Sequence, residues 1–403
     1  MRGGIVLKIL LANFSKMVND SGGAAKVFCA FANEMCLRGH DVAMMYCDDK
    51  EGDFFYHVNE KARAINLQHA YGKHIAFPKR MKIKRELLRV ADIRRARKVN
   101  DDFIEEKLLG NIRRALDEIS PEVIVSWQPA ASKSFIMDIK TKSPVITMSH
   151  GDPEDYFHTY PVSELPAIER STVNQVLIPS FQDSLKKRFP NIKTVAIGNV
   201  VPQYEEMAEL DAEKESYKII FLARLVKNHK RPHIFVEAFI KLAKEFPQWH
   251  AELWGADDKL SYTKSMQKKI DQAGLGDRIK FMGTTHEVAS VLKQGDIFAF
   301  PSAYEGWGMS LTEAMSMGLP AVGFKNCSAV NELIENGKTG FLTDDGVDSF
   351  AEGLRKLMLD RSLRCKMGTA ARQAMKPYKA ENIWNTWEKL LQEIVDDSVK
   401  KKR

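Results

Sequence analysis

The chain has 403 residues, which exceeds the usual size of one domain and predicts two domains with separate cores. Hydrophobic residues make up 44% and charged residues 28% of it, as in ordinary globular proteins, which excludes a disordered chain. No apolar run approaches the roughly 18–20 residues that a membrane-spanning helix needs. The net charge of +7 is concentrated in two clusters, residues 79–98 and 400–403.

The first half alternates strand-like and helix-like segments, as a parallel sheet requires. The apolar run at the start of the chain is short, is interrupted by Lys8 and has no small-residue cleavage site, so it is not expected to be a signal peptide. A buried strand is expected at 5–13 instead. Gly22 and Gly23 then open an amphipathic helix that runs to about Arg38. Further strands are expected at 42–46, 123–127, 145–148 and 176–178.

A second alternation follows the polar, glutamate-rich stretch 203–216. Strands are expected at 218–223, 250–254, 279–282, 296–300 and 321–324, with helices at 232–246 and 263–273. This pattern predicts an α/β protein in which two Rossmann-like, doubly wound domains face each other across a cleft that holds the ligand. The expected divisions are an N-terminal domain at 1–202, a linker at 203–216, a C-terminal domain at 217–378 and, at 379–403, a helix that returns to the N-terminal domain.

Two glutamates follow the strand-like run that ends near Ser302. Glu305 falls on the expected strand-to-helix loop and Glu313 in the first turn of the next helix, expected at 311–318, with Gly306 and Gly308 between them. Two carboxylates beside such a turn can bind vicinal hydroxyls, and the free N–H groups of the helix start suit phosphate or sugar oxygens. The same spacing also fits a solvated loop followed by an ordinary helix start.

The motif Pro-Ser-x-x-Glu-Gly-x-Gly-x-x-x-x-Glu-Ala-Met-x-x-Gly-x-Pro resembles the signature of the retaining glycosyltransferases of family 4, which have the GT-B fold. The looser similarity extends from the first strand to about Leu354. The resemblance implies that Glu305 lies against the donor sugar and that Glu313 holds the nucleotide ribose. It also implies donor contacts from the residues between them, Gly306, Trp307, Gly308, Met309 and Ser310. Trp307 replaces the usual phenylalanine.

A nucleotide-sugar donor leaves a diphosphate whose charge must be stabilised. The chain contains no Asp-x-Asp, the motif of metal-dependent glycosyltransferases, so no metal is expected. Arg224 and Lys230 follow the first strand of the second half, where the resemblance implies an arginine and a lysine on the diphosphate. The family spacing is commonly one residue shorter, which would select His229 instead, and a solvated surface charge is the alternative for each of them.

Three further positions are candidates by resemblance. Gly22 and Gly23 match a glycine pair that faces the donor or acceptor, although a tight turn explains them equally well. His150 follows an expected strand and matches a histidine against the donor hexose, whereas a lone histidine is also commonly structural. Gly255 matches the first glycine of a Gly-x-Gly, but Asp257 replaces the second.

Some residues are given other roles. The loop 283–288 resembles the one whose backbone reads the nucleobase, and Asn199 resembles a structural hinge residue. Five scattered cysteines without a Cys-x-x-Cys pair indicate buried thiols in a reducing cytoplasm.

Ten cations lie between Lys79 and Lys98, with only Glu86 and Asp92 opposing them and with apolar residues interleaved. On a helical wheel this stretch can form an amphipathic helix with a cationic face. It could lie on an anionic membrane surface, bind an acidic or pyrophosphate acceptor, or be a solvated helix. Nucleic acid is not expected, because no recognised motif accompanies the cations.

The sequence therefore predicts a metal-independent retaining hexosyltransferase of polysaccharide or lipopolysaccharide synthesis, cytoplasmic and peripheral on the inner face of the plasma membrane. The donor is a nucleotide diphosphate sugar, with a UDP-sugar as first candidate, and the acceptor is a glycan or a lipid-linked glycan. No cofactor beyond this co-substrate is expected. His150, Glu305, Arg224 and Lys230 form the candidate catalytic set. The alternatives are a nucleotide-sugar 2-epimerase on the same fold and a non-catalytic nucleotide-sugar sensor.

Overall fold

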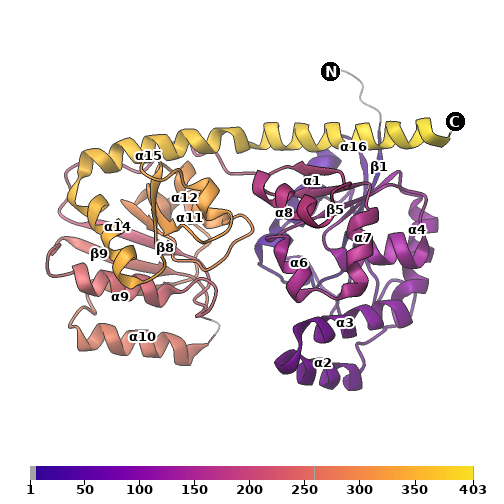
Figure 1. Ribbon diagram of the computed structural model, residues 1–403, viewed down its shortest axis with the longest axis horizontal. Coiled ribbons are helices and arrows are strands. Elements are labelled where there is room, and N and C mark those ends of the chain that lie inside the picture. Colours follow the sequence, from indigo (N-terminus) through magenta and orange to yellow (C-terminus); the bar gives the residue numbers. More distant parts are fainter. Residues whose placement is uncertain (1–5, 258, 403) are drawn as a thin grey trace. The chain divides into compact units, whose positions relative to one another are not determined.

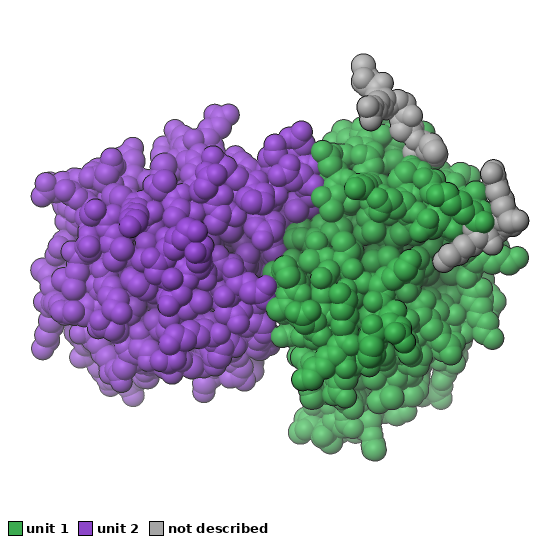
Figure 2. All heavy atoms as spheres, turned by 45° about the horizontal axis from the view of Figure 1, so that its top comes forward, with its two compact units in different colours: residues 1–198, 384–403 green, residues 199–383 purple. Residues whose placement is uncertain are grey.

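The computed structural model describes residues 6–257 and 259–402, with the side chains of the last two helical residues left out. The chain divides into two compact units (Figure 2). The first contains the residues up to Gly198 and those from Trp384 onward, and the second contains Asn199–Ile383.

A parallel sheet forms the centre of the first unit (Figure 1). It has seven strands, in the order β3-β2-β1-β4-β5-β6-β7. Its strands are β1 (Lys8–Asn13), β2 (Asp41–Tyr46), β3 (Arg63–Asn66), β4 (Val123–Ser126), β5 (Val145–Met148), β6 (Val173–Val176) and β7 (Thr194–Ala196). Strands β1, β4 and β5 are almost wholly buried, which explains why they read as continuous apolar runs.

Helices connect these strands. They are α1 (Gly23–Leu37), α2 (Lys79–Ala91), α3 (Ile93–Phe103), η1 (Ile104–Leu108), α4 (Leu109–Ile119), α5 (Pro129–Lys133), η2 (Ser134–Ile139), α6 (Glu154–Thr159), η3 (Val162–Glu164), α7 (Leu165–Arg170) and α8 (Pro179–Arg188). One core cluster joins Leu10 of β1 and Met45 of β2 to Phe103, Leu108 and Ile112 of the α3–η1–α4 segment. This burial holds α3 and α4 on the sheet.

A second parallel sheet, in the order β10-β9-β8-β11-β12-β13, forms the centre of the second unit. Its strands are β8 (Tyr217–Leu222), β9 (Trp249–Trp254), β10 (Ile279–Gly283), β11 (Ile297–Ala299), β12 (Ala321–Phe324) and β13 (Gly340–Thr343). Its helices are α9 (Pro232–Leu242), α10 (Leu260–Gln272), α11 (Val288–Lys293), α12 (Met309–Ser316), α13 (Val330–Leu333), α14 (Val347–Leu359), α15 (Arg361–Met375) and η4 (Lys376–Tyr378). In both sheets the strand order reverses beside the first strand of the unit, as in doubly wound folds.

The last helix, α16 (Ala380–Lys402), belongs to the first unit from Trp384 onward. The rings of Trp384 and Trp387 contact Phe31 of α1 edge-on, with centroid distances of 5.5 and 4.9 Å. Arg38 adds an ion pair of 2.5 Å to Glu388. Aromatic packing on α1 therefore fixes this part of α16 to the first unit.

Two segments differ from the sequence-based expectation in their bounds or packing. A strand was expected at 176–178, but β6 lies at Val173–Val176 and so ends where the expected strand begins. Ile178 is already the N-cap of α8, which begins at Pro179. The stretch 203–216 packs on the second unit, where Ala208 and Leu210 are buried and the N–H of Ala208 donates to the carbonyl of Met317 at 2.9 Å.

The basic stretch 79–98 forms two helices, where one was expected. Asp92 has extended backbone angles (φ −155°, ψ 107°) and ends α2. Its carboxylate accepts hydrogen bonds from the backbone N–H groups of Arg94 and Arg95 and so caps α3. An aspartate is favoured at this N-cap position, which explains the break.

Candidate functional site

Loops at the carboxyl ends of three neighbouring strands are joined by backbone hydrogen bonds in the second unit. The N–H of Leu225, after β8, donates to the carbonyl of Ala256, after β9, at 2.8 Å. The N–H of Gly255 donates to the carbonyl of Gly283, at the end of β10, at 2.7 Å. The loops that carry Arg224, Gly255 and the 283–288 segment therefore meet at one edge of the sheet.

Gly255 is required at its position by packing. Its φ of +150° is rare for other residues, and a Cβ atom there would lie 1.9 Å from the carbonyl oxygen of Ala223. No side chain fits this contact. The close approach of the two strand ends explains the glycine by itself, and the expected donor contact of Gly255 remains a prediction.

Glu305 lies on the loop after β11 and contacts the loop after β8. The N–H of Ala303 donates to the carbonyl of His229 at 2.8 Å, which ties the two loops together. The side chain of Glu305 is only 7% exposed and forms an ion pair with Lys230. The Nε2 atom of His229 lies 3.7 Å from the same carboxylate oxygen. Both alternatives for the expected basic partner, Lys230 and His229, are thus placed against Glu305.

The surroundings of His229 favour its neutral form. Its ring stacks on that of Tyr304 with a centroid distance of 4.2 Å. Burial lowers the pKa of His229, and the positive charges of Lys230 and Arg224 lower it further, against the opposing effect of Glu305. At neutral pH Lys230 therefore supplies the cation beside Glu305 and His229 contributes a neutral ring. Arg224 is exposed at the end of β8, near enough for its charge to act on His229.

Arg231 was not predicted and has a structural role next to this pair. Its backbone is left-handed (φ 49°), and its guanidinium donates to both carboxylate oxygens of Asp345 at 2.9 Å. Its Nε also donates to the carbonyl of Pro301 at 3.0 Å. The bonds from Nη1 and Nε fix the β8 loop to the β13 and β11 loops next to Lys230.

Helix α12 begins at Met309, with Gly308 before it in a left-handed conformation (φ 78°) and no side-chain cap. Met309 and Ser310, both partly exposed, lie in its first turn. The first N–H groups of a helix have no partner within it, and they face the end where the helix dipole is positive. This start of α12 is suited to an anionic oxygen, as expected from the sequence.

Glu313 and Trp307 differ in detail from the expectation. Because α12 begins two residues earlier than predicted, Glu313 is its fifth residue and lies beyond the first turn. Its side chain is largely buried. Burial raises the pKa of Tyr204, and the charge of Glu313 raises it further, so the two side chains are neighbours. Trp307 is buried, with its ring edge-on to Tyr378 at a centroid distance of 4.9 Å. The donor contacts of both residues remain predictions.

In the first unit, Gly22 and Gly23 lie where they were expected. Gly22 is the N-cap of α1 and Gly23 its first residue, and the helix start has no side-chain cap and no acidic residue in its first turn. The N–H of Gly22 donates to the carboxylate of Asp20 at 2.9 Å. Both glycines are exposed, so the backbone is accessible at this helix start.

Asp48 fixes the loop that leads to this glycine pair, a role not predicted from the sequence. It is buried directly after β2, and one carboxylate oxygen accepts from the N–H groups of Met17 and Val18, each at 2.9 Å. Asn66, at the end of β3, donates to the carbonyl of Asp48 at 2.9 Å and accepts from its N–H at 3.1 Å. The only sequence signal is an aspartate at a strand end.

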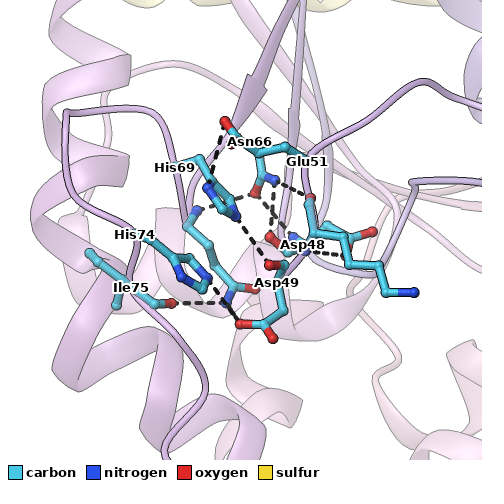
Figure 3. Close-up of polar contacts among 9 residues, drawn as sticks. Asp48, Asp49, Glu51, Asn66, His69, His74 and Ile75 are labelled. Atoms are coloured by element: carbon cyan, nitrogen blue, oxygen red, sulfur yellow. Dashed lines mark hydrogen bonds and ion pairs between the residues drawn. The ribbon is translucent and has the colours of Figure 1, made fainter.

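Two histidines extend this network toward α2. The rings of His69 and His74 stack with a centroid distance of 4.3 Å (Figure 3). His74 contacts the carboxylate of Asp49 at 3.1 Å, and His69 lies 3.7 Å from Glu51. These contacts order the segment between β3 and α2.

His150 follows β5 and packs against Trp127, which follows β4. The two rings stack with a centroid distance of 5.4 Å. Burial lowers the pKa of His150 to about 4, so the imidazole is neutral at physiological pH. Within the described part of the chain, the His150 Nε2 and Trp127 Nε1 atoms are buried without a hydrogen-bond partner. Both nitrogen atoms retain the capacity to hydrogen-bond to a ligand oxygen.

Neither a metal cluster nor a membrane-spanning helix is found in the described residues. Over residues 6–257 and 259–402, no group of three or more His, Cys, Asp or Glu side chains is arranged to hold a metal ion. No helix in the same ranges is long and apolar enough to cross a membrane. The five cysteines are unpaired, and all but Cys365 are buried.

Comparison with known proteins gives the following similarities. Residues 202–374 match the family described as Glycosyl transferases group 1. The chain is 24% identical over 397 residues to an exopolysaccharide phosphotransferase of Streptomyces coelicolor, covering 94% of this chain and 40% of that protein. It spans about half the length of several other curated relatives that it matches.

Two further similarities cover nearly whole chains. The chain is 22% identical over 381 residues (93% of this chain, 96% of the other) to a Campylobacter jejuni enzyme named GalNAc-alpha-(1->4)-GalNAc-alpha-(1->3)-diNAcBac-PP-undecaprenol alpha-1,4-N-acetyl-D-galactosaminyltransferase. The structure of Anabaena Alr3699/HepE in complex with UDP and glucose superposes with a TM-score of 0.69 and 18% identity, over 96% of this chain and 99% of the other. These results confirm the predicted architecture of two Rossmann-like α/β domains. The chain has the GT-B fold, and its residues 202–374 carry the sequence pattern of group 1 glycosyltransferases.

Proposed function

We propose that this protein is a retaining glycosyltransferase of family 4 that moves a hexose-type sugar from a nucleotide diphosphate sugar to a glycan or lipid-linked acceptor. The observation that carries the proposal is the contact of Lys230 with Glu305 at the joined strand-end loops of the group 1 segment. A buried carboxylate beside a cation, next to an uncapped helix start, provides groups for both halves of a nucleotide sugar.

The second unit would bind the donor. Lys230 and Arg224 would stabilise the charge that develops on the departing diphosphate, together with the first N–H groups of α12. Glu305 would accept a hydrogen bond from the donor sugar, and Glu313 would hold the ribose. Because Lys230 already contacts Glu305, the bound diphosphate would share this ammonium with the carboxylate.

The transfer step needs no side-chain nucleophile. The bond between the anomeric carbon and the diphosphate oxygen breaks, and a bond to the acceptor hydroxyl oxygen forms on the same face of the sugar. The proton of that hydroxyl passes to the departing phosphate oxygen. In this proposal Arg224 and Lys230 replace a metal ion as the source of positive charge.

The first unit would contribute neutral hydrogen-bonding groups. His150 is uncharged, and its buried Nε2 can bind a sugar hydroxyl without adding charge. The exposed backbone at the start of α1, where Gly23 is the first residue, can approach an oxygen of the donor or acceptor. Ring stacking on Trp127 holds the imidazole in place.

The names of the relatives support the substrate classes. One similar enzyme acts on an undecaprenol-linked glycan, another similar protein is named an exopolysaccharide phosphotransferase, and a similar structure holds UDP and glucose. We therefore propose a UDP-sugar donor and a role in cell-surface polysaccharide or lipopolysaccharide synthesis. The proposed location is the cytoplasmic face of the plasma membrane, reached through the basic stretch 79–98.

A donor screen tests this proposal. The full chain is incubated with UDP-, GDP- and ADP-sugars, and binding is followed by the shift in melting temperature. The donor that binds is then supplied with lipid-linked and soluble glycan acceptors, and the product is examined by mass spectrometry and NMR. A transferred sugar with the donor's anomeric configuration supports the proposal. Release of an epimer, binding without turnover, or an inverted product contradicts it.

A further inference from the structure

Helix α2 carries a stripe of aliphatic side chains on its outer face. Ile83, Leu87 and Val90 are 62%, 72% and 93% exposed. Their spacing of four and three residues places them on one side of the helix. The opposite side packs inward through buried Met81 and half-buried Leu88. Single exposed apolar residues are ordinary, whereas three in register form a continuous surface that a partner can cover.

Cations surround this stripe. By helical spacing, Lys79 and Arg80 flank it on either side in the first turn, and Lys82 and Lys84 lie farther round. Within the described ranges, these four exposed side chains have no hydrogen-bond or ion-pair partner. Glu86 is the only carboxylate on α2, and it contacts Arg85 and Arg89. The charge beside the stripe is therefore uncompensated.

The cations of α3 are engaged within the protein. Arg95 pairs with Asp92, and Lys98 pairs with Asp102. The remaining two contact the α6 region: the Arg94 Nε donates to the carbonyl of His158, and the Arg97 Nη1 donates to the hydroxyl of Thr159. Although α2 and α3 lie against each other (Figure 1), only α2 combines exposed apolar side chains with unpaired cations.

We propose that α2 is the membrane-docking element of this protein. It lies in the plane of an anionic lipid surface, with Ile83, Leu87 and Val90 in the boundary between headgroups and acyl chains and with the four unpaired cations on the lipid headgroups. A narrow aliphatic stripe bordered by cations on both sides matches such a surface in polarity and charge. The assignment deepens the proposed function, on which it rests for the membrane location of the acceptor.

Co-sedimentation of the full chain with lipid vesicles tests the assignment. The vesicles contain phosphatidylcholine alone or with about one third phosphatidylglycerol. One variant replaces the stripe (Ile83→Ser, Leu87→Ser, Val90→Ser) and a second replaces cations (Lys79→Gln, Lys82→Gln, Lys84→Gln). The matched control replaces three exposed lysines of the second unit that have no partner in the described structure (Lys244→Gln, Lys264→Gln, Lys268→Gln). All changed side chains are exposed, so each variant should fold.

Wild type and control should bind anionic vesicles at low salt and should bind neutral vesicles at least tenfold more weakly. The cation variant should lose about fivefold in affinity per lysine removed at low salt, and less as salt rises, because salt screens this attraction. The stripe variant should lose at least tenfold at low and high salt alike, because burial of apolar groups is not screened.

Two results would overturn the assignment. One is equal binding by the wild type and the stripe variant. The other is an equal loss in the cation variant and the control. The oligomeric state is also measured by sedimentation without vesicles. A lower oligomeric state in the stripe variant than in the wild type would show that a second copy of the chain covers the stripe, and this result would also overturn the assignment. Donor binding is measured on all variants, since loss of membrane binding with intact donor binding separates this inference from the proposed function.

Discussion

The two parallel sheets carry different kinds of side chain at the carboxyl ends of their strands. At the carboxyl ends of β8 and β11 the second unit gathers charge, with Lys230 on Glu305 and Arg231 on Asp345. At the carboxyl ends of β4 and β5 the first unit presents neutral rings, Trp127 and His150. One architecture thus supports an ionic edge after β8 and β11 and a neutral edge after β4 and β5, because the loops that follow the strands vary independently of the sheet that positions them.

Buried carboxyl groups show the same contrast. In the second unit cations neutralise them, as Lys230 does for Glu305 and Lys214 for Asp296, the latter at 2.8 Å. In the first unit Asp101 and Glu164 are buried, and the two side chains interact. Burial raises the pKa of Glu164, and the charge of Asp101 raises it further. Burial also raises the pKa of Asp101. At this pair the first unit therefore limits its buried charge by protonation, whereas buried Asp48 accepts backbone N–H groups.

The largest expected effect comes from separating Lys230 and Glu305. Lys230→Met or Glu305→Gln should lower kcat/KM by a factor equal to about 2–4 kcal/mol of lost transition-state stabilisation, because in the proposed function each contacts donor groups that change charge during transfer. Steady-state kinetics and melting temperature are measured for both variants, for the double variant and for Lys227→Met, an exposed lysine of the same loop. If the pair is only structural, the double variant recovers stability and activity together. If it acts on the donor, stability alone recovers.

The neutral edge is tested at His150. His150→Phe keeps a ring against Trp127 but removes both ring nitrogens. The value of kcat/KM should fall by a factor equal to about 1–3 kcal/mol of lost transition-state stabilisation. Because the pKa of His150 is lowered to about 4, the lost activity should be the same at pH 6 and pH 8. His158→Phe, at an exposed position, is the control. A loss that follows the ordinary histidine pKa would refute the neutral role, and full activity would remove His150 from the site.

Replacing Glu164 by Gln tests how the first unit limits its buried charge. The pKa of this carboxyl is raised in the folded protein, so the folded state holds a proton that the unfolded state loses as pH rises above about 4.5. Stability therefore falls with rising pH over this range. Glu164→Gln should stabilise the first unit at pH 8 by about 1 kcal/mol, roughly 2–4 °C in melting temperature, and reduce the pH dependence. Exposed Glu169→Gln should change neither quantity, and a destabilised Glu164→Gln would contradict the argument.

The smallest expected effect is that of a chelator. If Arg224 and Lys230 neutralise the departing diphosphate, EDTA should leave the transfer rate unchanged within error. Rates are measured after dialysis against EDTA and again after addition of magnesium or manganese. Loss of activity that either metal restores would show that the cations of the ionic edge are insufficient.

Much of the fold and part of the site could be predicted from local sequence. Buried parallel strands read as apolar runs, and residues directly after them must lie at one edge of the sheet. This reasoning alone places Arg224, His150 and Glu305 at strand ends. Helix α12 begins two residues earlier than its sequence pattern indicates, because only the backbone shows that Gly308 is left-handed and caps the helix.

Other features depend on contacts between residues far apart in the chain. The sequence left Lys230 and His229 as alternatives, and folding placed both against Glu305, 75 and 76 residues away. The Asp101–Glu164 contact joins two segments with no shared pattern, and the contrast between α2 and α3 depends on which cations find partners. Local propensity and periodicity determined the strands, helices and strand-end loops of this protein. Tertiary packing alone decided which charges meet, which are buried and which remain exposed on α2, because these depend on distances between segments that periodicity does not encode.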